Sequence, residues 1–467
     1  MRDGMDLPEY LKSGEAARLF PVLADTSKEG RTLSILLSCL CYVDEFGKAL
    51  LSSVGQRVGS RASLRAFTEV VFKGEKESRQ FRPDGLILLT VGSRTWSAVV
   101  EAKVGISELK SEQIENYLEL ARNNNIDAVI TVSNQFAAQD SHYPVPVNPA
   151  AMRKTSLYHW PWMYVLTQAN LLISNDEIID RDQRIILNEF VRFLTHDSAG
   201  VRGFDQMPAA WTDLVSYVQA GSLPVANSSP TREVISAWHQ EVRDLSLILS
   251  RKTAAHVKPR LSRAHAADHV ARMKAEAANF ADTACLSATF DVPDAAAPLE
   301  VCADFRTQSI TVSMRLRAPD DRKSTKARTS WLLRQIPDLD SLDYYLRLFW
   351  PGRSPATQHQ IKRLRDETAL AEVERVGQVA SSFEVMLVRK LGKRFGQRKN
   401  FVTDLEVIIP EFYQDVGQRL KAYQPPAPKI REDKQGQTNI GVSDLQVAAE
   451  VEAHEQQATP RDQSVEE

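Results

Sequence analysis

The sequence has few cysteines and no long apolar run. Four cysteines in 467 residues are too few for a disulfide framework, and their spacing matches no zinc motif. No hydrophobic stretch approaches the roughly 20 residues that a helix needs to cross a bilayer. The N-terminal residues lack the apolar core of a secretory signal. These absences predict a protein of the reducing cytoplasm that has no membrane partner.

A phosphate-binding glycine loop of the Gly-x-x-x-x-Gly-Lys type is also missing, so this chain is not expected to be an ATP-driven motor. The net charge is only −2, but seven acids and one arginine lie beyond Ser443, and the rest of the chain is therefore net positive. Bases gather in residues 315–328 and 389–399, and the second segment contains no acid. If the partner is a nucleic acid, these segments predict contacts to phosphates.

The N-terminal half alternates helical and strand-like patterns. After a lead-in of residues 1–30, residues 31–54 carry apolar side chains at helical spacing and predict one long helix. Short apolar runs then predict strands, with a helix at 108–122 between the third run and the fourth. The predicted strands are 66–72, 85–91, 98–100 and 128–132. Less distinct patterns predict a strand at 156–159, a helix that follows it through residue 172, and a helix at 182–194. We therefore expect an α/β domain over residues 31–200, built on a mixed sheet flanked by helices.

The C-terminal half predicts a second domain. Residues 201–232 read as a helix and a linker, because the stretch 221–231 is rich in small, turn-forming residues. Residues 233–423 then read as an α+β domain, and residues 424–467 as an acidic, disordered tail. The second domain's predicted strands are 286–292, 299–305, 310–317 and 383–388. The first three are expected to pair antiparallel and to expose one face to solvent. Its predicted helices are 326–335, 358–367 and 404–422.

Charged residues lie at the ends of two neighbouring predicted strands. Asp84 opens the second strand, while Glu101 closes the third and Lys103 follows it. Strand side chains alternate, so Glu101 and Lys103 share a face. Two carboxylates, together with the backbone carbonyl of Ala102, form an all-oxygen site that suits Mg²⁺ or Mn²⁺ better than zinc. The sequence predicts metal-assisted phosphodiester hydrolysis, with the lysine beside the attacking water.

The Pro-Asp and Glu-Ala-Lys motifs, in this order of elements, resemble the PD-(D/E)xK nuclease superfamily over roughly residues 31–195. The helix that follows carries Gln113 and Tyr117, which match the Gln-x-x-x-Tyr motif of the RecB-like branch. The resemblance implies a restriction-endonuclease-like fold, a magnesium-dependent nuclease activity and DNA as the substrate, with RNA not excluded. It also implies that Gln113 supports the catalytic residues. On a helix, Gln113 and Tyr117 are four apart and share a face.

Several alternatives stay open from the sequence alone. Other superfamily members place a further glutamate on the first strand or the first helix, which makes Glu69 and Glu45 competing candidates for a fifth catalytic residue. Asp84 could instead cap a turn, with Glu101 and Lys103 as exposed charges. The whole chain could be a non-catalytic nucleic-acid-binding or assembly module that retains the nuclease fold. The second domain could bind nucleic acid, a protein partner or a second copy of the chain.

Overall fold

The structure is a computed structural model, and it describes residues 7–20, 27–73, 82–137 and 143–425. Residues up to Tyr423 cluster into one compact unit, which contains two β-sheets. The predicted acidic tail lies outside the described residues from residue 426 onward. The α/β character predicted for the chain is therefore confirmed, and each sheet can be described with the helices that cover it.

The first sheet is mixed, as predicted. Its six strands follow one another in chain order, β1 to β6. The first four strands pair antiparallel, whereas β4 pairs with β5 and β5 with β6 in parallel. The strands are β1 (Leu11–Ala16), β2 (Ala62–Phe72), β3 (Gly85–Val91), β4 (Arg94–Ala102), β5 (Ala128–Ser133) and β6 (Ser156–Pro161). Strand β1 falls in the segment read as a lead-in, which therefore belongs to this sheet.

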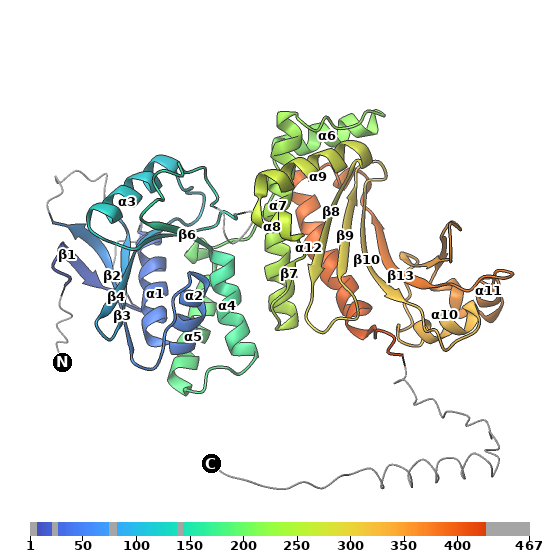
Figure 1. Ribbon diagram of the computed structural model, residues 1–467, viewed down its shortest axis with the longest axis horizontal. Helices are drawn as coiled ribbons and strands as arrows, with labels where there is room; N and C mark the ends of the chain where they lie inside the picture. The colour runs from blue at the N-terminus through green and yellow to red at the C-terminus, as the bar shows by residue number, and fades with distance from the viewer. Residues whose placement is uncertain (1–6, 21–26, 74–81, 138–142, 426–467) are drawn as a thin grey trace, which may run out of the picture. The chain divides into compact units, whose positions relative to one another are not determined.

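Helices cover both faces of the first sheet (Figure 1). Alternate side chains of β3 and β4 pack on opposite faces: Leu86 and Val99 join the hydrophobic cluster of α3, whereas Val100 joins the larger cluster of the other four helices. The helices are α1 (Lys28–Tyr42), α2 (Asp44–Ser53), α3 (Ser111–Asn123), α4 (Trp162–Ser174) and α5 (Arg181–Leu194). The face that carries α3 is the one on which the candidate residues lie.

The single helix predicted over residues 31–54 is wrong. The chain breaks at Val43, whose backbone is extended (φ −116°, ψ 99°), into α1 and α2. The apolar spacing continues across the break because both helices pack on the same core, and Val43 is itself fully buried. Helix α1 also begins at Lys28, ahead of the predicted start, and this difference changes which acid reaches the candidate site.

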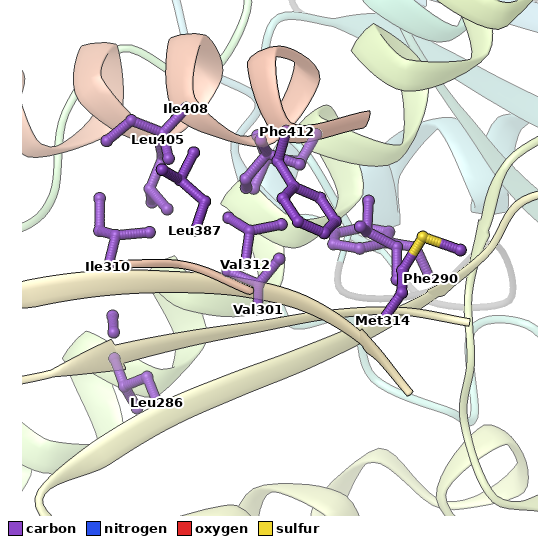
Figure 2. Close-up of a cluster of buried hydrophobic side chains, with 14 of the residues drawn as sticks. Leu286, Phe290, Val301, Ile310, Val312, Met314, Leu387, Leu405, Ile408 and Phe412 are labelled. Carbon is purple, nitrogen blue, oxygen red and sulfur yellow. The ribbon is translucent and has the colours of Figure 1, made fainter. Parts of the chain in front are cut away.

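The second sheet is antiparallel throughout, in the order β12-β11-β13-β10-β9-β8-β7. Its strands are β7 (Lys258–Pro259), β8 (Cys285–Asp291), β9 (Leu299–Asp304), β10 (Ser309–Arg317), β11 (Tyr344–Phe349), β12 (Thr357–Gln360) and β13 (Ser382–Lys390). One face is apolar and packs against α12, as Figure 2 shows for Val312, Leu387 and Phe412. The three antiparallel strands predicted from strict alternation, now β8 to β10, are confirmed.

The helices of this half complete a second hydrophobic cluster. They are α6 (Ala209–Gln219), α7 (Ser229–Thr253), α8 (Arg263–Ala267), α9 (His269–Thr283), α10 (Thr325–Leu333), α11 (Glu367–Ala371) and α12 (Arg398–Asp415). The stretch 221–231 starts after α6, its last three residues form the first turn of α7, and both of these helices contribute to the second cluster. The chain passes from the first cluster to the second between Val201 and Met207, ahead of the predicted linker.

The helix predicted over residues 358–367 is wrong. Residues Thr357–Gln360 form the edge strand β12, whose Gln360 pairs with Tyr345 of β11. Helix α11 starts only at Glu367. Strand β12 is polar, and the buried Ile361 and Leu364 that follow it are three residues apart. A spacing of three residues is typical of a helix, which explains the wrong prediction. The edge strand is held by backbone pairing, and its sequence therefore shows no apolar alternation from which a strand could be predicted.

Candidate active site

The hairpin of β3 and β4 brings the predicted residues to one place. Its register pairs Gly85 with Val100, so Asp84 comes to the level of Glu101 at the open end of the hairpin. Leu86 and Val99 face α3, and alternation places Asp84, Glu101 and Lys103 on that same face. The sequence pattern and the observed register therefore agree on the position of all three side chains.

Short hydrogen bonds tie these residues together. Lys103 Nζ donates to Glu101 Oε1 at 2.6 Å, and Gln113 Nε2 of α3 donates to the same oxygen at 2.6 Å. The backbone N–H of Ala102 donates to Asp84 Oδ2 at 2.9 Å. In an extended strand the N–H and C=O of one residue point to the same edge, so the carbonyl of Ala102 is directed toward Asp84 as well.

The Gln-x-x-x-Tyr pair lies against this group. Gln113 Nε2 lies 3.2 Å from the hydroxyl of Tyr117, one turn further along α3, and that hydroxyl donates to the carbonyl of Arg82 at 3.1 Å. The tyrosine ring is buried in the cluster under α3. Tyr117 thus fixes the amide that contacts Glu101, and it joins the helix to the segment just before Asp84.

Burial and like charge shape the ionisation of the site. Burial raises the pKa of Asp84 well above its usual range, and the nearby carboxylate of Glu101 raises it further, although Lys103 and the Ala102 N–H act in the opposite direction. Burial alone would lower the pKa of Lys103, but Glu101, Asp84 and Glu29 together raise it above its ordinary value. The lysine therefore stays a cation in a group of side chains that holds more acids than bases.

Glu29 is the acid that sequence reasoning missed. It lies in the first turn of α1, and its Oε2 is 3.4 Å from Lys103 Nζ. Glu69 instead pairs with Arg82 at 3.1 Å, with both side chains half exposed, and Glu45 lies in the first turn of α2. The backbone N–H of Glu69 donates to the carbonyl of Asp84 at 3.2 Å, but among the described residues no hydrogen bond or ion pair joins the carboxylate of Glu69 or Glu45 to the other candidate side chains.

One observation indicates that these oxygen atoms suit a cation. Both donors that reach Glu101 use Oε1, whereas Oε2 is buried and has no hydrogen-bond partner. Glu101 is only 1% exposed, so bulk solvent does not reach this oxygen. Asp84, Glu101 and the Ala102 carbonyl would hold the ion through oxygen, as Mg²⁺ and Mn²⁺ require. Within the described ranges, no group of three or more His, Cys, Asp or Glu side chains is arranged to bind a metal, so the set depends on that carbonyl.

A buried histidine supports the loop next to the site. Glu101, Thr131 and His159 form one row across β4, β5 and β6. His159 Nδ1 is 2.9 Å from the Thr131 hydroxyl, and its Nε2 is 2.8 Å from the carbonyl of Gln135. The Gln135 amide oxygen accepts the N–H of Leu109, just ahead of α3. Burial lowers the pKa of His159 to about 4, so the ring is a neutral structural link.

Comparisons with protein-family models, with curated proteins and with solved structures find no match for this chain. In the part of the chain that the structure describes, no helix combines the length and the apolar character needed to cross a membrane.

Proposed function

We propose that this protein is a metal-dependent nuclease that hydrolyses phosphodiester bonds in DNA, with Asp84, Glu101 and Lys103 at its centre. The observation that carries the proposal is the bare, buried Oε2 of Glu101, which lies in a group that contains a second carboxylate and a lysine. A buried carboxylate oxygen without a partner is costly in a folded protein, and a bound cation compensates it.

Each side chain has a distinct part in this proposal. Asp84 and Glu101 would hold Mg²⁺ or Mn²⁺, and a bound ion supplies Lewis-acid polarisation of the phosphate and lowers the pKa of an attacking water. Gln113 donates to Oε1 of Glu101 and so leaves Oε2 available, where it would bind an ion. Lys103 keeps its proton beside the carboxylates, where its ammonium group orients the water and balances charge on the phosphate.

The test is cleavage of a labelled DNA duplex by the full-length protein with magnesium, manganese, calcium or excess chelator. We expect activity with magnesium or manganese, none with chelator, and inhibition by calcium, which binds carboxylates but supports this chemistry poorly. Glu101→Gln keeps the size of the side chain and should reduce cleavage to background. Gln113→Ala removes only a support for the ligand and should slow cleavage roughly 10- to 100-fold.

Glu69→Gln is the matched control, because it makes the same chemical change at a half-exposed acid outside the hydrogen-bonded group. It should cut DNA like the parent. Folded Glu101→Gln that cleaves as fast as the parent would overturn the proposal. A parent that binds DNA without any metal-dependent cleavage would instead favour the alternative of a non-catalytic binding module.

A further inference from the structure

The base-rich segment at the end of β13 has a divided arrangement. Three of its arginine side chains are used within the protein: Arg389 pairs with Glu411 and Asp343, Arg394 with Asp404, and Arg398 Nε lies against the carbonyl of Met207. Its three lysines are exposed, and no side-chain partner among the described residues engages them. They are Lys390, Lys393 and Lys399, and we call residues 390–399 the lysine loop.

Contacts with the second hydrophobic cluster and with β10 hold the backbone of the lysine loop in place. Phe395 is fully buried, and its ring lies 5.4, 5.2 and 5.0 Å from those of Trp211, Phe305 and Phe401. The indole N–H of Trp211 donates to the Phe395 carbonyl at 2.7 Å. At the other end of the loop, the Leu391 N–H donates to the carbonyl of Gln308 at 2.9 Å. The three lysines therefore project from a fixed frame.

We propose that the lysine loop is a surface that binds the phosphate backbone of duplex DNA. The inference rests on the proposed action on DNA and adds to it a binding surface that is separate from the catalytic group. Residues 389–399 contain six bases and no acid, and the three acids that pair with Arg389 and Arg394 leave this segment with its partners three units positive. Lysines held on a fixed frame complement the regular negative charge of a duplex and read no sequence.

The chemistry also explains why lysines rather than arginines remain free. An arginine makes directed, bidentate contacts and is used here to fix the loop, as in the two hydrogen bonds from Arg394 to Asp404 at 2.7 and 3.0 Å. A lysine is a flexible point charge, which can follow phosphates as the protein moves along the backbone. The division of labour predicts affinity without sequence preference.

The experiment measures binding of a fluorescent mixed-sequence duplex by anisotropy, in chelator so that no cleavage occurs, over a range of salt concentrations. Replacing Lys390, Lys393 and Lys399 together by alanine should reduce the slope of log affinity against log salt by about 2.7, at about 0.9 for each lost phosphate contact. The binding curves of variant and parent should converge as salt rises. Lysine→arginine at all three positions keeps the charges and should keep the slope.

The matched control replaces three exposed lysines elsewhere in the same half, Lys252, Lys258 and Lys274, which changes the net charge equally. An unchanged slope in the loop variant, an equal loss in the control, or a parent that does not bind the duplex would each overturn the inference. Cleavage in magnesium is scored separately: the loop variant should raise KM and leave kcat unchanged. A parent that binds through the loop but never cleaves refutes the proposed nuclease and not the binding surface.

Discussion

Glu241 in α7 offers a test of the second core that does not depend on function. Its side chain is 0% exposed, and neither carboxylate oxygen has a hydrogen-bond partner. Burial raises the pKa of Glu241 well above its usual range, and the neighbouring acids Asp244 and Glu406 raise it further. The protonated, neutral form is therefore favoured in the folded state, and its desolvated oxygens destabilise the fold.

Glu241→Met removes both oxygens and keeps an unbranched side chain of similar length. An unsatisfied buried polar group costs about 1–3 kcal/mol, so we expect the variant to be more stable than the parent by about this amount. The carboxyl's raised pKa favours the folded state below the unfolded pKa, and this contribution is lost as pH rises through the folded pKa. The advantage of methionine should therefore grow toward alkaline pH.

Hydrogen exchange followed by mass spectrometry on peptides from α7 measures the effect locally, because α7 contributes buried residues to the second core. Glu233→Met is the matched control, since Glu233 lies on the same helix but is exposed, and its change should stay within about 0.5 kcal/mol. If Glu241→Met is no more stable than the parent, or if Glu233→Met stabilises equally, the reasoning about unsatisfied oxygens is refuted.

Three further outcomes can be measured. Gly85→Ala would place a Cβ 2.9 Å from Leu37 Cδ1, so it should destabilise the protein by about 1–3 kcal/mol and slow cleavage by displacing the adjacent aspartate. In Gly59→Ala the new Cβ meets no atom within 4 Å, so this control should change neither the melting temperature nor the cleavage rate. Burial raises the pKa of Asp244 to about 6, so about 3 kcal/mol of stability should be lost between pH 4 and pH 7, and Asp244→Asn should flatten this loss in urea titrations. His159 has the opposite sign: its pKa of about 4 means that about 3 kcal/mol is lost as pH falls from 6.5 to 4, and an NMR titration that finds it protonated at pH 6 would contradict this.

The placement of the candidate residues could be predicted from the sequence because period-two alternation and strand order are local properties. Asp84 and Glu101 fall at strand ends, and the observed register of β3 and β4 brings them to one level. Spacing also predicts that Gln113 and Tyr117 share one face of α3, but only the family resemblance implied that this face turns toward the site. The positions of Asp84, Glu101 and Lys103 follow from spacing, which a single sequence contains.

The third acid could not be chosen in this way. The sequence predicts a first helix from residue 31, which leaves Glu29 outside it and offers Glu69 and Glu45 as the candidates instead. Which acid reaches Lys103 depends on where α1 starts relative to the sheet, and this is a tertiary property. His159 gave no signal for the same reason, because a lone histidine in a strand acquires meaning only from Thr131 and Gln135 beside it.

In the second half, strict alternation identified β8, β9 and β10, but the order of the seven strands brings β13 between β10 and β11. The chain leaves the sheet between these strands, and such long-range pairing has no trace in local spacing. Strand β11 does alternate buried and half-buried side chains from Tyr344 to Phe349, yet it was not recognised beside the polar edge strand β12.

The turn at the far end of the β3–β4 hairpin determines which residues of the two strands lie opposite each other at the site. Val91 pairs with Arg94 across two residues, and Gly92 adopts the positive φ of 63° that this tight connection uses. Six pairs further along, the same count sets Gly85 against Val100. One residue inserted into the turn would shift the ladder by one, and Asp84 and Glu101 would then point to opposite faces. The relative position of the two acids therefore depends on the length of a surface turn that neither of them touches.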